Sequence, residues 1–278
     1  LGSKSVAIGQ FTLADQNFET ATATFNTAVG FQAGSNVATG VQNTLIGASV
    51  GDALNVGEKN VALGYVALST DTKGNKSTAL GYAALNAQNF TSPTDTFNTA
   101  VGFEAGGGVT TGTNNTLIGA FSGLSITTAT SNVHVGGECG QFSITGAQNT
   151  FVGYKAAKGI TGAKLTGNNN TAVGYQSGLL LQGAATLNTF VGVDSGVAVT
   201  TGVNNTYLGA LAGDGTDDGD GNTAVGKSAL SANCGDSNVA VGLNALIACT
   251  NNNNTAVGTA AGDNVTSGTQ NTLIGAQV

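Results

Sequence analysis

Few side chains in this sequence are of the kinds that carry out catalysis. His134 is the only histidine, and no serine or acidic residue stands at a telling spacing from it to complete a Ser-His-Asp triad. Glu104 and Glu138 occupy equivalent places two repeats apart, which corresponds to about 10 Å of stacked strands, and Asp194 lies three repeats further on. A glycosidase holds its two carboxylates about 5 to 9.5 Å apart. The sequence therefore predicts that the chain is not an enzyme.

One short segment is rich in carboxylates and could supply oxygen ligands for calcium. Its spacing does not match an EF-hand loop, which ends in a bidentate glutamate. We interpret the segment as a solvated turn, with calcium binding as the alternative, and we expect no other cofactor or metal. The four aspartates of the segment are Asp214, Asp217, Asp218 and Asp220.

The three cysteines divide into one isolated residue and one pair. Cys139 falls in a column of small residues and is expected to behave as a core side chain. Cys234 and Cys249 follow their repeat glycines by eight and seven residues, on adjacent repeats that would lie about 5 Å apart. That separation suits a disulfide, and two buried thiols are the alternative.

The composition excludes two classes of partner. Only 8% of the residues are charged, the chain contains eight lysines and arginines, and its net charge is −7. Nucleic acid is therefore not expected as a partner, because phosphate binding needs a basic surface. No apolar run reaches the eighteen or so residues that a membrane span requires, so this segment is not expected to insert into a membrane.

One pentapeptide, Asn-Thr/Val-x-Val/Ile/Leu-Gly, dominates the sequence. Its copies are mostly 17 residues apart, and a longer period of 72 residues carries Gly30 to Gly102 and on to Gly174. A short repeat of this kind predicts an all-β parallel solenoid of about sixteen coils, forming a single domain over residues 1–278. The sixteen copies end at Gly9, Gly30, Gly47, Gly64, Gly81, Gly102, Gly119, Gly136, Gly153, Gly174, Gly192, Gly209, Gly226, Gly242, Gly258 and Gly275.

The residues of the pentapeptide should alternate between the two faces of a strand. We assign the Thr/Val position and the Val/Ile/Leu position to the inside of the coil, so the middle residue should point outward. Because that middle column is almost entirely apolar, something must cover it, and another copy of the chain is the simplest candidate. The predicted interface residues are Ala28, Leu45, Leu117, His134, Phe151, Phe190, Tyr207 and Leu273.

Three further columns describe the rest of each coil. Asparagine opens fourteen of the sixteen pentapeptides, with Ser5 and Ser77 in the other two, and such a column can form an amide ladder from coil to coil. The third residue after the glycine is small in nearly every coil, and the fourth is glycine or leucine except at Ala157. These columns predict two short strands per coil, joined by tight turns.

Three coils are longer than the rest, at residues 10–25, 86–97 and 158–169, which repeat about every 72 residues. We expect their loops to bulge from the same corner of the solenoid and to contact a receptor or lock protomers together. Structural decoration is the alternative. The candidate loop residues are Phe18, Phe90, Pro93, Lys158 and Lys164.

The pentapeptides also resemble a known family. The motifs at residues 5–9, 60–64 and 238–242 resemble head repeats of YadA-like trimeric autotransporter adhesins, and residues 170–178 look like repeats in phage and viral tail fibres. The resemblance covers essentially the whole chain, although these coils are longer than typical adhesin-head repeats. It implies a trimeric left-handed β-roll on a virion or cell surface that attaches to a glycan or protein receptor. A tail fibre is the preferred expectation, and a bacterial adhesin or other extracellular filament is the alternative.

Two other functions remain open from the sequence. A monomeric solenoid could bind ice or a polysaccharide along its threonine columns, but that function needs the threonines to point outward in flat rows. A glycan-cleaving tailspike is a more distant alternative, because such an enzyme needs a pair of carboxylates and this sequence offers no convincing pair.

Overall fold

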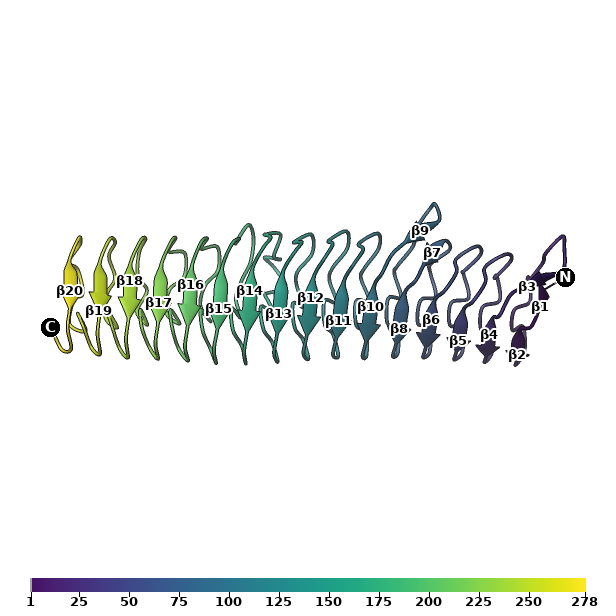
Figure 1. Cartoon of the computed structure of the whole chain (residues 1–278), viewed down its shortest axis with the longest axis horizontal. Coiled ribbons are helices and arrows are strands. Elements are labelled where there is room, and N and C mark those ends of the chain that lie inside the picture. The colour runs from purple at the N-terminus through teal and green to yellow at the C-terminus, as the bar shows by residue number, and fades with distance from the viewer. Residues whose placement is uncertain (1) are drawn as a thin grey trace. The chain divides into compact units, whose positions relative to one another are not determined.

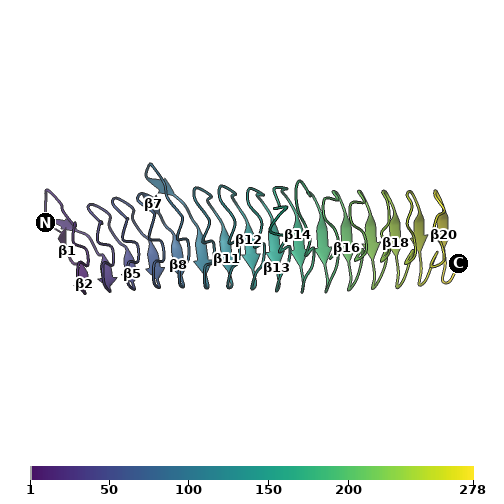
Figure 2. The ribbon, with the colours of Figure 1, turned by 180° about the vertical axis from the view of Figure 1, so that it is seen from behind.

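Each pentapeptide forms one strand of a parallel β-solenoid of about sixteen turns that contains no helix. The computed structural model describes residues 2–278 and divides into two compact units, one up to Gly137 and one from Glu138 onward. Within each unit the principal strands follow one another in chain order (Figures 1 and 2). The repeat runs through both units, and a single domain over 1–278 stays a prediction. The first unit contains β2 (Val6–Ile8), β4 (Thr27–Val29), β5 (Thr44–Ile46), β6 (Val61–Leu63), β8 (Thr78–Leu80), β10 (Thr99–Val101), β11 (Thr116–Ile118) and β12 (Val133–Val135).

The second unit repeats the same arrangement. Its strands are β13 (Thr150–Val152), β14 (Thr171–Val173), β15 (Thr189–Val191), β16 (Thr206–Leu208), β17 (Thr223–Val225), β18 (Val239–Val241), β19 (Thr255–Val257) and β20 (Thr272–Ile274). Neighbouring strands pair in register, so that each column of the sequence stacks on itself; Thr27, for example, lies opposite Thr44 in β5. The predicted parallel solenoid is therefore confirmed.

The two faces of the strand are assigned the wrong way round by the sequence analysis. The middle residue points into the coil and the residues on either side of it point out. Seven of the eight predicted interface residues, including His134, are completely buried by their own chain, and Leu273 in the last strand is partly buried. Both faces are apolar, so hydrophobicity alone could not decide which one is inside. These residues therefore offer no surface to a second copy.

The size of the middle residue is matched by the fourth residue after the glycine. Where the middle residue is large, the fourth is glycine in every coil except that of Phe151, which has Ala157. A Cβ on Gly213, for example, would lie 2.3 Å from Cε2 of Tyr207. A large middle side chain also reaches the coil before its own, as Leu45 shows. A Cβ on Gly51 of the same coil would lie 2.9 Å from one Cδ atom of Leu45, and a Cβ on Gly34 of the preceding coil would lie 2.7 Å from the other. Where a coil and the next both have alanine in the middle, as at Ala62 and Ala79, leucine fills the fourth position.

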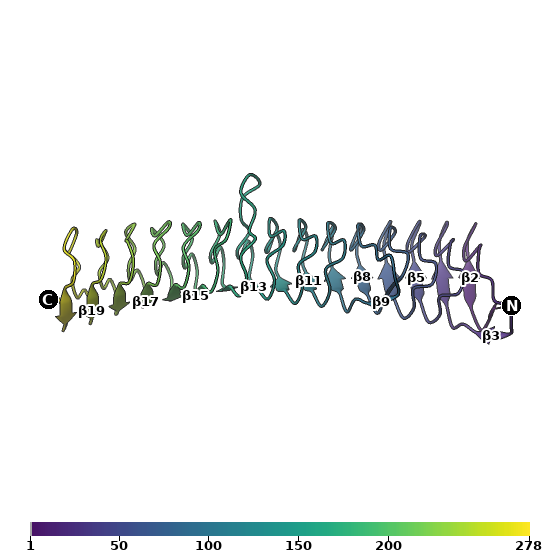
Figure 3. The same cartoon turned by 90° about the horizontal axis from the view of Figure 1, so that it is seen from above.

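The second half of each coil is a series of tight turns rather than a second strand. Residues two and four positions after the repeat glycine adopt left-handed backbone angles, such as φ 50° at Val66 and 52° at Leu68. These angles interrupt an extended strand, so the prediction of two strands per coil is wrong for most coils. Among residues 2–278 the only additional strands are β1 (Gly2–Ser3) with β3 (Thr22–Ala23) and β7 (Gly74–Asn75) with β9 (Thr94–Asp95). Figure 3 shows the principal strands of each unit along one side of its coils.

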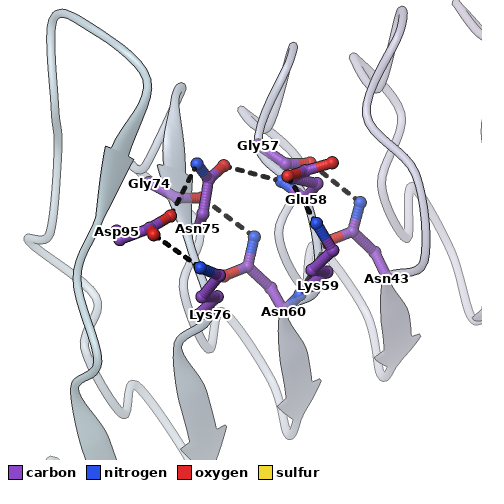
Figure 4. Close-up of polar contacts among 9 residues, drawn as sticks. All are labelled: Asn43, Gly57, Glu58, Lys59, Asn60, Gly74, Asn75, Lys76 and Asp95. Carbon is purple, nitrogen blue, oxygen red and sulfur yellow. Dashed lines mark hydrogen bonds and ion pairs between the residues drawn. The ribbon is translucent and has the colours of Figure 1, made fainter.

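The asparagine column forms the predicted ladder, with buried amides that bind mainly to backbone (Figure 4). Asn43 donates from Nδ2 to the carbonyl of Gly57 at 2.9 Å, and its Oδ1 accepts from the backbone N–H of Asn60 at 3.0 Å. Asn60 repeats both contacts one coil further on, with Gly74 and Ser77. Each amide thus satisfies two backbone groups of the next coil, and each such bond contributes about 1 kcal/mol to stability.

The two serines in this column occur where longer loops follow. Ser77 Oγ lies 2.6 Å from Thr96 Oγ1 and accepts from Gln88 Nε2 at 2.8 Å, and Gln88 Oε1 accepts from Asn98 Nδ2 at 2.9 Å. Ser5 makes the same two contacts, with Thr24 and Gln16. The longer loop delivers a glutamine and a threonine to the ladder, and the short serine side chain leaves room for them.

The size match predicts a coupled pair of substitutions in the second unit. Gly213→Leu should destabilise the protein by roughly 1–3 kcal/mol through overpacking, and Tyr207→Ala by about 3–5 kcal/mol through loss of a buried aromatic ring. The double variant should be more stable than Tyr207→Ala alone, because it recreates the Ala224–Leu230 arrangement of the following coil. Urea unfolding of the four proteins measures this coupling, and strictly additive effects would contradict it.

The buried histidine predicts a pH dependence of stability. Burial lowers the pKa of His134 from 6.5 to about 3, so between these values the unfolded chain binds more protons than the folded chain. The free energy of unfolding should therefore fall by about 2–3 kcal/mol between pH 7 and pH 4.5. His134→Phe should remove this part of the slope in urea unfolding at the two pH values. Burial raises the pKa of Asp52, Asp71 and Asp214, which has the opposite sign but is common to both proteins. Equal slopes for the two proteins would refute the assignment.

Candidate functional site

The outward side of the principal strands is a continuous apolar surface within each unit. We call it the strand face and define it as the first and third residues of each principal strand. The third residue is always valine, isoleucine or leucine, and many of these side chains are exposed: Leu63 by 48%, and Ile118 and Leu208 by 38% each. Twelve of the first residues are threonine and four are valine. The third residues are Ile8, Val29, Ile46, Leu63, Leu80, Val101, Ile118, Val135, Val152, Val173, Val191, Leu208, Val225, Val241, Val257 and Ile274.

The chemistry of the strand face is that of contact rather than catalysis. It carries no charged residue and no histidine or cysteine, only aliphatic groups and threonine hydroxyls. In-register pairing places the hydroxyls in rows, as for Thr189, Thr206 and Thr223. Within the described part of the chain, no helix has the length and apolar character that crossing a bilayer demands. A surface of this kind can pack on another apolar surface or against a regular array.

Stacked aromatic rings follow the repeat glycine in several coils. Tyr65 and Tyr82 stack with ring centroids 5.7 Å apart, and Tyr82 stacks on Phe103 at 4.9 Å with the planes 6° apart. The second unit contains the pair Tyr154 and Tyr175 at 5.9 Å. Stacking covers one face of each end ring and both faces of Tyr82, and all five rings remain about half exposed. Sequence analysis missed this ladder, although phenylalanine or tyrosine after the glycine in six coils was a visible signal.

The residues predicted to contact a receptor have different environments. Phe90 is only 6% exposed, so it belongs to the core of its loop and is wrong as a contact residue. Pro93 and Lys164 are exposed, and Phe18 is half-buried. Lys158 is half-buried and forms an ion pair with Glu138, with Nζ 2.5 Å from Oε2.

The three long loops are not alike. The first two build the short parallel ladders β1–β3 and β7–β9. The third is closed by an antiparallel bridge between Ile160 and Ala163. This bridge begins seven residues after the repeat glycine of its coil, whereas β9 in the second long loop begins thirteen residues after Gly81. The prediction that all three leave the same corner of a coil is therefore wrong. The third loop projects beyond the turns of its own unit in Figure 3.

Several of the carboxylates singled out in the sequence have other hydrogen-bond partners in the structure. Among residues 2–278, no three or more histidine, cysteine, aspartate or glutamate side chains cluster closely enough to hold a metal ion. Asp217 Oδ1 instead accepts from Thr200 Oγ1 at 2.5 Å, and Asp220 Oδ1 accepts from the backbone N–H of Val203 at 2.8 Å. The hydrogen bond from Lys158 lowers the pKa of Glu138, which is the opposite of what a catalytic acid needs. The structure thus gives no support to the calcium alternative or to the glycosidase pair.

The cysteines are buried free thiols, so the disulfide alternative is not realised in this structure. Cys139 donates from Sγ to the carbonyl of Phe151 at 3.2 Å, which agrees with its predicted core position. Cys234 Sγ lies 3.1 Å from Thr216 Oγ1. Burial raises the pKa of Cys234 to about 11, so this thiol is protonated and weakly nucleophilic at neutral pH.

The burial of all three thiols predicts how they react. The folded protein should take up no iodoacetamide at pH 7.5, and the urea-unfolded protein should take up three labels per chain, as measured by intact mass. A single label on the unfolded chain, together with a mass two hydrogens lower before labelling, would show that Cys234 and Cys249 form a disulfide after all.

Comparison with known proteins identifies no relative of this chain. No family model, no curated protein and no solved structure matches the chain. A functional assignment therefore depends on the strand face, the loops and the character of the repeat itself.

Proposed function

We propose that this chain is a structural segment of an extracellular attachment fibre, whose copies pack together through the strand face. The observation that carries the proposal is the uncharged apolar surface that every coil extends through its outward strand residues. Soluble monomers rarely expose contiguous apolar patches larger than a few hundred Å², and larger patches mark interaction sites. The interface role predicted for the middle column thus passes to the residues on either side of it.

A second copy of the chain is the partner that fits this surface best. Two identical solenoids share one coil spacing, so their aliphatic columns can stay in step over many coils. Neither copy carries a charge on the strand face that would have to be desolvated. The resemblance to YadA-like head repeats favours three copies and a left-handed winding, and we adopt both as part of the proposal.

In such a fibre the role is adhesion rather than catalysis. Three identical chains would present three copies of each loop, and avidity then compensates for weak individual contacts with a glycan or protein receptor. We propose a virion tail fibre as the setting, since residues 170–178 look like repeats of that class, with a cell-surface adhesin or filament as the alternative. Nucleic acid and membrane insertion have no part in this role.

Substitutions on opposite faces of one strand test the proposal. Leu63→Asp combined with Leu208→Asp places a charge on the strand face of each unit, and should reduce the molecule from three chain masses to one in light scattering. Its circular dichroism should stay unchanged, because both side chains point outward. Tyr207→Asp is the matched control, because its side chain points inward and it should unfold the coil instead. A wild-type protein that is already monomeric, or a double variant that remains trimeric, contradicts the proposal.

The rows of outward threonines favour a second candidate function. The sequence analysis discounted an ice- or polysaccharide-binding solenoid because the threonines were assigned to the inside, and they instead lie outside in register. Under this alternative the wild-type protein is a monomer, lowers the freezing point of water non-colligatively, and loses that activity in Thr116→Lys. Thermal hysteresis measured beside light scattering separates the two functions.

A further inference from the structure

Two shallow depressions lie at equivalent places in the 72-residue period. The first is lined by Val66, Tyr82, Ala83, Asn86, Glu104, Gly107 and Leu124, and the second by Lys155, Lys158, Gly159, Gln176, Leu179 and Leu180. Each has a volume of about 220 Å³. Adding 72 to Ala83, Asn86, Glu104 and Gly107 gives Lys155, Lys158, Gln176 and Leu179, so the same part of the coil is hollowed once in each unit. What differs is the charge of the lining.

The second depression gathers cations in a chain that has few. Two of the four lysines in the second unit, Lys155 and Lys158, line it. Lys158 is neutralised by Glu138 at 2.5 Å. Lys155 takes part in none of the ion pairs among residues 2–278, and its Nζ lies over the Tyr154 ring at 4.9 Å. The site therefore holds one uncompensated positive charge beside an amide.

We infer that the second depression binds an acidic sugar residue, either a uronate or a sulfated hexose. The anionic group pairs with Lys155, a ring hydroxyl bonds to the Gln176 amide, and the C–H face of the sugar packs on Leu179 and Leu180. A volume of about 220 Å³ is below the usual range for drug-sized ligands and suits a single sugar ring. The depression is open to solvent on one side, so neighbouring sugars of a chain can extend out of it.

An acidic peptide fits this site less well, because backbone N–H groups of the lining residues already donate hydrogen bonds within the protein. Gln176 N–H donates to the Tyr154 carbonyl at 3.0 Å, Leu179 N–H to Gln176 at 3.2 Å, and Gly159 N–H to Leu179 at 2.8 Å. A peptide that recognises a protein by adding a strand needs a free sheet edge. The side chains that line the depression, a lysine, an amide and two leucines among them, match the groups of an acidic sugar.

The inference deepens the attachment role proposed above, since it names the class of receptor. The first depression serves as an internal comparison. It carries Glu104 where the second carries Gln176, and alanine and asparagine where the second carries lysines. An acidic sugar should be repelled there, so one site per chain is expected.

Calorimetric titration of the wild-type protein with three hexasaccharides tests the site: hexagalacturonate, a sulfated galactose hexamer and neutral galactohexaose. We expect an acidic hexamer to bind with one site per chain and the neutral hexamer not to bind, and the two acidic probes distinguish carboxylate from sulfate. Lys155→Glu should weaken binding at least tenfold. Lys227→Glu makes the same charge change at an exposed residue elsewhere in this unit and should change the affinity less than twofold. Equal binding of all three sugars, no binding at all, or equal effects of the two variants would overturn the inference.

A gain-of-function variant gives an independent readout. Ala83→Lys, Asn86→Lys and Glu104→Gln together give the first depression the two lysines and the glutamine of the second, with Leu124 as its apolar surface. This variant should raise the stoichiometry from one site to two. An unchanged stoichiometry in a variant with native circular dichroism counts against the site. The strand-face double variant, Leu63→Asp with Leu208→Asp, separates this inference from the fibre proposal: sugar binding should persist in it whatever its oligomeric state.

Discussion

In-register stacking of one coil on the next is the constraint on which the rest of this structure depends. Each coil has no core of its own, so its strand, its asparagine and its turn glycine must fall on their counterparts in the neighbouring coil. The buried amides enforce this register, because Asn43 and Asn60 each bind two backbone groups of the next coil. Insertions are accommodated where the hydrogen bonds of the ladder are kept, as between Asn149 and Asn170, or replaced, as by Gln88 and Thr96 around Ser77.

The sequence predicts the period, the parallel pairing and the asparagine ladder, since each depends on residue spacing alone. It does not predict which face of the strand lies inside. Ala28 and Leu45 are as apolar as Val29 and Ile46, so the usual contrast between a wet and a dry face is missing. The information was nevertheless present in the fourth position after the glycine, where glycine or leucine follows the size of the middle residue. Recognising it requires knowing that these two positions touch.

The candidate sites follow the same division. The composition of the strand face is readable from the sequence. Alternation alone, however, places its threonines and aliphatic residues in the core and predicts the assembly surface on the wrong column. The charged depression was partly visible, because Lys158 and Lys164 were singled out as loop residues. Lys155 and Gln176 belong to different coils and line the same depression only because the coils stack, so their spacing along the chain does not predict that they lie close together.

The match between large middle residues and glycines has a consequence for how such a chain can lengthen. Leu45 occupies space over glycines in two successive coils. If its coil alone were copied and the copy inserted after the coil of Leu68, the copied Leu45 side chain would clash with Leu68. A gene duplication survives when its breakpoints fall between compatible neighbours. The coils of Gly30, Gly102 and Gly174 meet that condition, because each pairs a middle alanine with a fourth glycine and precedes a coil with a large middle residue. The four-coil blocks that run from Gly30 to Gly102 and from Gly102 to Gly174 therefore begin and end between compatible neighbours.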